Sequence, residues 1–178
     1  MRKILVFIAA LVAISSATAV ADVRVDFGFT VPWRLGAQIS SLDEEVDDFD
    51  FDVLSQITIL LPEVMVAYQE PVGPVNLGVG LRGFSLIVQS LLWPVVYAEY
   101  DFGPAVVNFN FGGGAFVFLG LYNDITTGSL FFPDLSAHAK LGRRFRAGLG
   151  VVGVLSGDLP EGVTPYMIYL NAKFSFLN

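Results

Sequence analysis

The stretch YAEYDFGPAVVNFNFGGGAF, residues 97–116, decides the fold of this chain. Gly103 and Pro104 mark a tight turn between its two apolar segments. After the turn, apolar side chains occupy alternate positions (Val107, Phe109, Phe111), and the positions between them carry asparagine or glycine. An alternation with a period of two predicts β-strands.

The two faces of such a strand allow two surroundings. In a soluble protein the apolar face packs into a core. In a transmembrane β-barrel the apolar face meets lipid, while small and polar residues fill a narrow interior. The composition favours the barrel: 54% of the residues are hydrophobic, only 15% are charged, and the mean hydropathy is +0.64. No internal run reaches the roughly 18 apolar residues that a spanning helix needs.

The N-terminus reads as a secretory signal peptide over residues 1–21. Arg2 and Lys3 precede the apolar run ILVFIAALVAI, and the small-residue segment SSATAVA follows it. We expect cleavage after Ala21, with Ala19 as the second choice and a membrane anchor helix as the alternative. Loss of Arg2 and Lys3 takes the formal net charge from −7 to −9, which argues against nucleic acid as a partner.

The remainder, residues 22–178, is expected to form one domain of eight strands. They are predicted at 23–33, 53–70, 75–88, 91–102, 105–119, 131–142, 145–155 and 166–177. Short turns follow the second, fourth and sixth strands, whereas most other connections are longer, including an acidic loop at 41–52. This pattern predicts an all-β, antiparallel, up-and-down barrel with both termini in the periplasm.

Three irregularities are expected within the strands. A change of parity predicts a bulge at Pro62 and Glu63, because a one-residue slip would turn every side chain to the other face. Pro94 interrupts the fourth strand. The triple glycine at 112–114 marks a bend in the fifth strand rather than a phosphate-binding loop, because no helix follows it.

The inward face collects charged residues among glycines and amides. They are Arg24, Asp26, Glu63, Arg82, Glu99, His138, Lys140, Arg146 and Lys173. An eight-stranded barrel has an interior just wide enough for side chains to fill, so we expect these charges to pair and plug the lumen. A conduction path lined by the same charges is the alternative.

No residue is predicted to be catalytic or to bind a metal, and no cofactor is expected. The chain has one histidine, His138, and no cysteine, which do not make a typical metal site. Lipid A deacylases carry a serine two residues after the catalytic histidine, where this chain has Lys140. The acidic run at 41–52 is interpreted as a solvated loop, with cation binding as the alternative.

Aromatic residues gather toward the two predicted ends of the barrel, as in the aromatic girdles of membrane barrels. Trp33, Trp93, Phe131, Phe132 and Tyr166 are expected at the outer end, and Tyr68, Tyr100, Phe102, Phe145, Phe174 and Phe176 at the inner end.

On this topology the chain resembles the small eight-stranded outer-membrane proteins of the OmpW, OmpX and OmpA-barrel type, over its whole mature length. The C-terminal strand is the most specific part of the resemblance. Tyr169, Asn171, Phe174 and Phe176 occupy the places of the assembly signal, although Asn171 stands where glycine is usual and Leu177 and Asn178 follow the last aromatic residue. The resemblance implies recognition by the outer-membrane barrel assembly machinery.

The predicted function follows from this resemblance. The long second strand and the acidic loop lean toward OmpW, whose members are thought to pass small hydrophobic molecules into the membrane. We therefore expect a porin-like or OmpW-like protein of the bacterial outer membrane, in contact with its lipid and without enzymatic activity. A surface-exposed interaction barrel without transport is the alternative, followed by a secreted lipocalin-like lipid binder.

Overall fold

The computed structural model describes residues 22–39, 47–53, 59–86 and 88–177. The predicted signal peptide with its cleavage site, and part of the predicted acidic loop, lie outside these residues. In the described part, no helix is long and apolar enough to cross a membrane. Its elements are the strands β1 (Asp22–Ile39), β2 (Asp47–Asp52), β3 (Leu61–Val72), β4 (Val75–Leu86), β5 (Gln89–Asp101), β6 (Ala105–Gly120), β7 (Asp124–Lys140), β8 (Phe145–Gly153) and β9 (Val163–Leu177).

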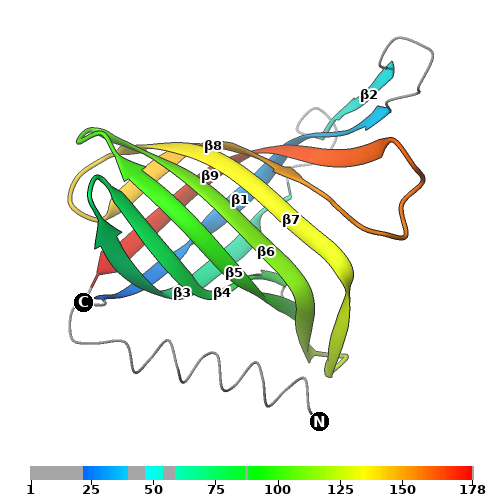
Figure 1. Ribbon diagram of the computed structural model, residues 1–178, viewed down its shortest axis with the longest axis horizontal. Helices are drawn as coiled ribbons and strands as arrows, with labels where there is room; N and C mark the ends of the chain where they lie inside the picture. The colour runs from blue at the N-terminus through cyan, green and yellow to red at the C-terminus, as the bar shows by residue number, and fades with distance from the viewer. Residues whose placement is uncertain (1–21, 40–46, 54–58, 87, 178) are drawn as a thin grey trace.

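Eight of these strands form a closed antiparallel barrel (Figure 1). Each strand from β3 to β8 pairs with the next, and β1 closes the cylinder by pairing with both β3 and β9. β2 stands apart from the cylinder because it pairs only with the second half of β1, from Arg34↔Asp52 to Ile39↔Asp47. The eight-stranded, all-β barrel predicted from the sequence is confirmed.

The two ends of the barrel differ. The start of β1 and the end of β9 lie at one end, together with the short turns at 73–74, 102–104 and 141–144 (Figure 1). We call this the terminal end. At the other, the hairpin end, the β1–β2, β6–β7 and β8–β9 hairpins project beyond the barrel wall (Figure 1).

The start of the second predicted strand is wrong. β3 begins at Leu61, and its pairing with β1 runs without a shift through Phe29↔Pro62 and Gly28↔Glu63. The predicted bulge at Pro62 and Glu63 is therefore absent. The apolar residues change from odd to even positions here because Ile59 and Leu60 precede β3. They therefore do not follow the alternation of the strand.

Two predicted loops are instead largely strand. β1 continues to Ile39, residues 47–52 of the acidic stretch form β2, and β7 begins at Asp124 rather than at residue 131. The ladder between β6 and β7 extends through Ala115↔Thr127 to Phe118↔Asp124. Polar residues in these segments resembled loops because a ladder that projects into water needs no apolar face.

The other two expected irregularities coincide with shifts in register. β5 itself runs unbroken through Pro94, which pairs with Leu81 of β4, but its pairing with β6 shifts between Leu92 and Val95. The pairing of β6 with β7 shifts between Gly113 and Ala115. Gly113 and Gly114 have φ angles of +125° and +75°, a region that glycine enters without a steric penalty.

Side chains sort to the two surfaces of the barrel wall as the alternation predicts. Outward apolar residues are well exposed on the outer surface, as Phe27, Val66, Phe109 and Leu135 show. Inside, most polar and charged side chains are buried, although Met65, Ala67, Val95 and Tyr97 form a small apolar cluster among them. This facing is the reverse of that in a soluble lipid-binding barrel, so the lipocalin-like alternative does not fit.

Candidate functional site

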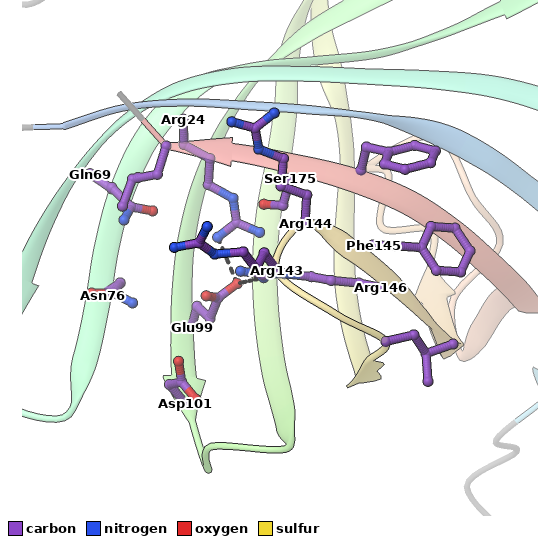
Figure 2. Close-up of a pocket in the computed structure, with 13 residues that line it drawn as sticks. Arg24, Gln69, Asn76, Glu99, Asp101, Arg143, Arg144, Phe145, Arg146 and Ser175 are labelled. Atoms are coloured by element: carbon purple, nitrogen blue, oxygen red, sulfur yellow. Dashed lines mark hydrogen bonds and ion pairs between the residues drawn. The ribbon is translucent and has the colours of Figure 1, made fainter.

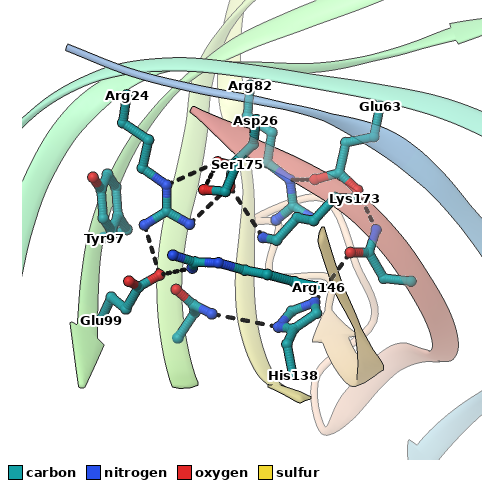
Figure 3. A network of polar contacts seen from close by, with 12 residues as sticks. Arg24, Asp26, Glu63, Arg82, Tyr97, Glu99, His138, Arg146, Lys173 and Ser175 are labelled. Carbon is teal, nitrogen blue, oxygen red and sulfur yellow. Dashed lines mark hydrogen bonds and ion pairs between the residues drawn. The ribbon is translucent and has the colours of Figure 1, made fainter. Parts of the chain in front are cut away.

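The polar interior begins, near the terminal end, with Arg24 on β1. Its guanidinium donates to both carboxylate oxygens of Asp26, at 2.9 and 2.8 Å, and to Glu99 on β5 at 2.6 Å (Figure 3). The guanidinium carbon also lies 5.3 Å from the ring centroid of Tyr97. Arg24 is only 2% exposed, and these contacts give its buried charge the partners that it requires.

Glu99 and Asp26 each collect further partners from across the barrel. Arg146 on β8 donates to the same Glu99 oxygen that Arg24 contacts, at 2.6 Å. The ammonium of Lys173 on β9 lies 3.2 Å from Asp26, and the Ser175 hydroxyl donates to Asp26 at 2.5 Å. Four strands (β1, β5, β8 and β9) are thereby joined by charge-assisted hydrogen bonds.

A second group of charges, nearer the hairpin end, is centred on Arg82 of β4. Its Nε donates to Glu63 of β3 at 2.8 Å, and its Nη1 donates to Asp134 of β7. The hydroxyl of Tyr169, on β9, donates to the other oxygen of Asp134 at 2.6 Å. Asp134 is 1% exposed, so this carboxylate is fully enclosed by its partners.

Asn171 on β9 connects the second group to His138. Its Nδ2 donates to Thr30 at 2.9 Å and to Glu63 at 3.0 Å, while its Oδ1 lies 3.0 Å from Nε2 of His138. Nδ1 of His138 lies 3.4 Å from Nδ2 of Asn108. Both ring nitrogens of His138 therefore contact side-chain amides, so His138 is a structural member of the network.

The structure brings together eight of the nine charged residues that the alternation placed inside the barrel. Lys140 differs, since it pairs with Asp101 at the rim of the terminal end, where both side chains are partly exposed. Three further members of the network, Asp134, Tyr97 and Tyr169, were not predicted from the sequence. Asp134 shares the parity of Ser136 and His138, so continuing the alternation one step would have found it.

The network balances its charge. Four cations (Arg24, Arg82, Arg146 and Lys173) face four anions (Asp26, Glu63, Glu99 and Asp134). Among the described residues, every buried side-chain nitrogen or oxygen has a hydrogen-bond partner. The cavity at the level of Arg82 and His138 measures about 10 Å³, which is room for about one water molecule. This packing favours a plug over a conduction path.

A polar vestibule of about 840 Å³ opens at the terminal end (Figure 2). Arg143 and Arg144 in the β7–β8 turn, with Arg146 at the start of β8, supply its positive charge. Glu99 and Asp101 supply its negative charge, but Glu99 is already paired inside the barrel and Asp101 is paired with Lys140 at the rim. An arginine-rich mouth on a chain with a net charge of −7 is a local reversal of sign.

An apolar cup of about 360 Å³ opens at the hairpin end, above the ionic network. Trp93 lies at its centre, with its ring centroid 5.4 Å from that of Phe84 and 5.4 Å from that of Phe132. The rest of the lining comes from six strands and the segments beside them, namely Leu35, Gly36, Leu91, Val152, Val154, Pro165, Tyr166 and Met167, with Arg82, Asp134 and Tyr169 as its polar members. Apolar walls with a few convergent polar groups are typical of small-molecule sites.

The cup corrects part of the predicted outer girdle. Trp93 is only 4% exposed and faces the interior, and Phe132 and Tyr166 line the cup with it. Trp33 is exposed, and Phe131 stacks on the outward-facing Phe111, with ring centroids 5.5 Å apart. Trp93 has the same parity as the buried Tyr97 and Glu99, so the alternation along β5 itself turns it toward the interior.

The aromatic residues predicted for the inner end gather at the terminal end of the barrel. Tyr68, Tyr100, Phe102, Phe174 and Phe176 are all exposed. Tyr100 packs on Phe102, with ring centroids 4.5 Å apart, and Phe145 packs on Phe174 at 5.1 Å. Together they form an aromatic belt around the outside of the barrel at this end.

Outside the barrel wall, the turn between β6 and β7 is held by local hydrogen bonds, some of which involve a carboxylate. The hydroxyl of Tyr122 donates to the carboxylate of Asp124 at 2.6 Å. This hydrogen bond lowers the pKa of Asp124 and raises the pKa of Tyr122. Among the described residues, no group of three or more histidine, cysteine or acidic side chains is placed to hold a metal ion.

Comparison with known proteins gives structural likenesses at low sequence identity. No family model and no curated protein matches the chain. Among solved structures, Neisserial surface protein A (NspA) is 11% identical, with a TM-score of 0.46, over 86% of this chain and 97% of its own. Ail, the attachment invasion locus protein of Yersinia pestis, is 7% identical, with a TM-score of 0.35, over 88% and 99%. At these values the function of neither protein transfers to this chain.

Proposed function

We propose that this chain is a bacterial outer-membrane barrel that takes up a small apolar molecule through the cup at its hairpin end. The membrane placement is supported by the sorting of the wall, with apolar side chains outward and a charge-balanced network inward. Only a closed barrel satisfies all backbone hydrogen bonds in lipid when the chain crosses with strands. The terminal end would then face the periplasm.

The cup is the observation that carries the proposed uptake. A site walled by Phe84, Trp93 and Phe132 excludes water from its ligand, and burial of apolar surface is the main source of affinity for such a ligand. Its volume of about 360 Å³ suits a molecule of one or two rings or a short alkyl chain. The packed network below the cup stands in the way of straight passage to the periplasm.

A sideways exit into the membrane is the route that we propose instead. β3 pairs with β1 only as far as Thr30↔Leu61, and beyond that point the same edge of β1 pairs with β2. Among the described residues, the ladders of β3 with β1 and with β4 therefore end at Thr30 and at Phe84, which leaves a seam between β1 and β4 near the level of the cup. Leu35 of β1 and Phe84 of β4 line the cup on the two sides of this seam.

The two tryptophans of the chain allow a matched test, because Trp93 lies in the cup and Trp33 lies outside the barrel. Folded Trp33→Phe protein in detergent is titrated with bromobenzene, which quenches tryptophan fluorescence on contact. We expect saturable quenching of Trp93. The Trp93→Phe protein, which keeps only Trp33, should show only a linear loss from quencher dissolved in the micelle.

A cup variant completes this test. Leu91→Asp, made in the Trp33→Phe protein, places a charge in the apolar wall and should abolish the saturable phase. Equal and linear quenching of Trp33 and Trp93 would show that the cup holds no ligand, and the proposal of uptake would be withdrawn. Folding of each variant is checked by its heat-modifiable migration on gels.

Contact with another surface is the second candidate function, and the β6–β7 hairpin favours it. Its tip exposes Leu121, Tyr122 and Ile125, the first of them to 84%. Apolar side chains held this far out are more typical of a contact surface than of a transport device. An apolar tip that contacts cells or lipopolysaccharide would lose adhesion on substitution of Leu121 and Ile125 by serine, with ligand quenching of Trp93 unchanged.

A further inference from the structure

Two arginines of the terminal vestibule, Arg143 and Arg144, differ from those of the ionic network in their lack of acidic partners among the described residues. Arg146 is paired with Glu99 at 2.6 Å. Within the described part of the chain, neither Arg143 nor Arg144 makes a hydrogen bond or ion pair through its guanidinium. The guanidinium of Arg144 instead lies over the ring of Phe176, 5.0 Å from its centroid. Two cations at this rim are thus available for an anion.

The turn that carries these arginines is fixed to the barrel. The N–H of Ser175 on β9 donates to the carbonyl of Arg144 at 2.8 Å, and the N–H of Leu141 donates to the carbonyl of Phe145 at 2.9 Å. The turn is therefore a held structure next to the end of β9, and Figure 2 shows its arginines together at the vestibule. Because the backbone that carries the two arginines is already ordered, less entropy is lost when they bind an anion.

The lining of the vestibule continues onto the outer surface of the barrel. Phe145 and Phe174 line it together with Leu141 and Leu177, and Phe174 is 47% exposed on the outer wall. Positive charge therefore meets apolar surface at one rim, beside the aromatic belt. A ligand that matches both parts carries a phosphate next to hydrocarbon chains.

We infer that Arg143 and Arg144 bind the phosphodiester headgroup of a lipid in the adjoining leaflet, with its acyl chains along Phe145 and Phe174. This inference rests on the proposed membrane placement, but not on uptake through the cup. Guanidinium groups pair with phosphate through two parallel hydrogen bonds, which suits Arg143, whose donors no other described residue uses. The lipid would seal the rim where β8, the shortest strand of the barrel wall, begins.

Native mass spectrometry of the folded protein in a neutral maltoside detergent tests this site. Three probes separate the two parts of the lipid that the site would recognise. Dioleoyl phosphatidylglycerol has phosphate and acyl chains, dioleoylglycerol has acyl chains without phosphate, and inorganic phosphate has phosphate without acyl chains. We expect phosphatidylglycerol to bind at least tenfold more tightly than either of the others. Equal binding of dioleoylglycerol would overturn a phosphate site, and equal binding of inorganic phosphate would overturn a lipid site.

The double variant Arg143→Gln, Arg144→Gln tests the residues themselves. Each arginine near a lipid surface contributes enough for about a fivefold change in affinity, so the pair should weaken phosphatidylglycerol binding roughly 30-fold. Arg34→Gln removes one positive charge at the hairpin end and should leave the binding unchanged. Unchanged binding in the double variant would overturn the inference, while saturable quenching of Trp93 in the same protein would show that the cup still functions.

Discussion

Arg82 is the residue on which the packed interior most depends. It is 7% exposed, and it lies between two buried carboxylates, Glu63 and Asp134. A buried ion pair contributes little net stability compared with a good apolar packing, but removal of one partner leaves uncompensated charge in the interior. The consequence of losing Arg82 should therefore greatly exceed that of losing an exposed cation.

We predict that Arg82→Met lowers the free energy of unfolding by about 3–5 kcal/mol. Urea-induced unfolding from phospholipid vesicles, followed by tryptophan fluorescence, measures this loss. Lys140→Met is the control, because the Lys140–Asp101 pair is partly exposed and its loss should cost no more than about 1 kcal/mol. Similar losses in both variants would contradict a buried, interdependent network.

The Arg82→Met loss should shrink when both carboxylates are neutralised. In a Glu63→Gln, Asp134→Asn background the guanidinium no longer compensates two buried negative charges. We expect the further change to Met to cost clearly less there than in the natural protein. Equal costs in the two backgrounds would assign the effect to lost packing around the arginine stem rather than to charge.

Among the strands, β6 shows how a local break shapes the hairpin end. The positive φ of Gly113 and Gly114 allows the register shift from which the β6–β7 hairpin projects. A Cβ atom at Gly113 would lie 2.3 Å from the carbonyl oxygen of Leu130, which is backbone and has little room to move. Both the dihedral angle and the space therefore require glycine.

Gly113→Ala should destabilise the barrel by about 1–3 kcal/mol, from strain at a positive φ and from the close contact. Gly128→Ala, in the facing strand, is the matched control because a Cβ there meets nothing within 4 Å. Its effect should stay within about 0.5 kcal/mol. The same urea experiment compares the two, and an equal loss of stability in both would show that the bulge is not under constraint.

At the scale of the whole molecule, the barrel wall separates apolar side chains, which point outward, from polar side chains, which point inward. Phe109 is 48% exposed on the outside, whereas the adjacent Asn110 is 8% exposed and faces the interior. Because the natural chain has no cysteine, a single introduced cysteine reports one position without background. The side of the wall that a given side chain faces can therefore be measured directly on the protein folded in vesicles.

Bimane attached to Phe109→Cys should be quenched several-fold more strongly by brominated lipid than bimane attached to Asn110→Cys. If a label at 110 prevents folding, Leu135→Cys and Ser136→Cys on β7 provide a second pair, since Leu135 faces Phe109 across the ladder and is exposed while Ser136 is buried. Stronger quenching at the inward position of either pair would refute the membrane placement, and with it the lipid site.

The side of the wall that each side chain faces was predictable from the sequence, because alternation along a strand is a local property. The residues of the first strand, from Arg24 to Thr30, and those of the last, from Asn171 to Phe176, turn to the sides that their parity predicted. The closed barrel of eight strands also followed, because lipid leaves no unpaired strand edge. Apart from Asp134, the charged members of the network were found this way.

Tertiary structure alone decided which of these residues meet. The Arg82–Asp134 contact spans 52 positions and the Asn171–Thr30 contact spans 141, so both depend on how the ladders align when the barrel closes. Trp93 has the same inward parity as Tyr97 and Glu99, but the apolar cup around it exists only because residues from several strands meet at its depth. Parity assigns a side chain to a face, whereas depth within the lumen and partners across it come from the closed register of all eight strands.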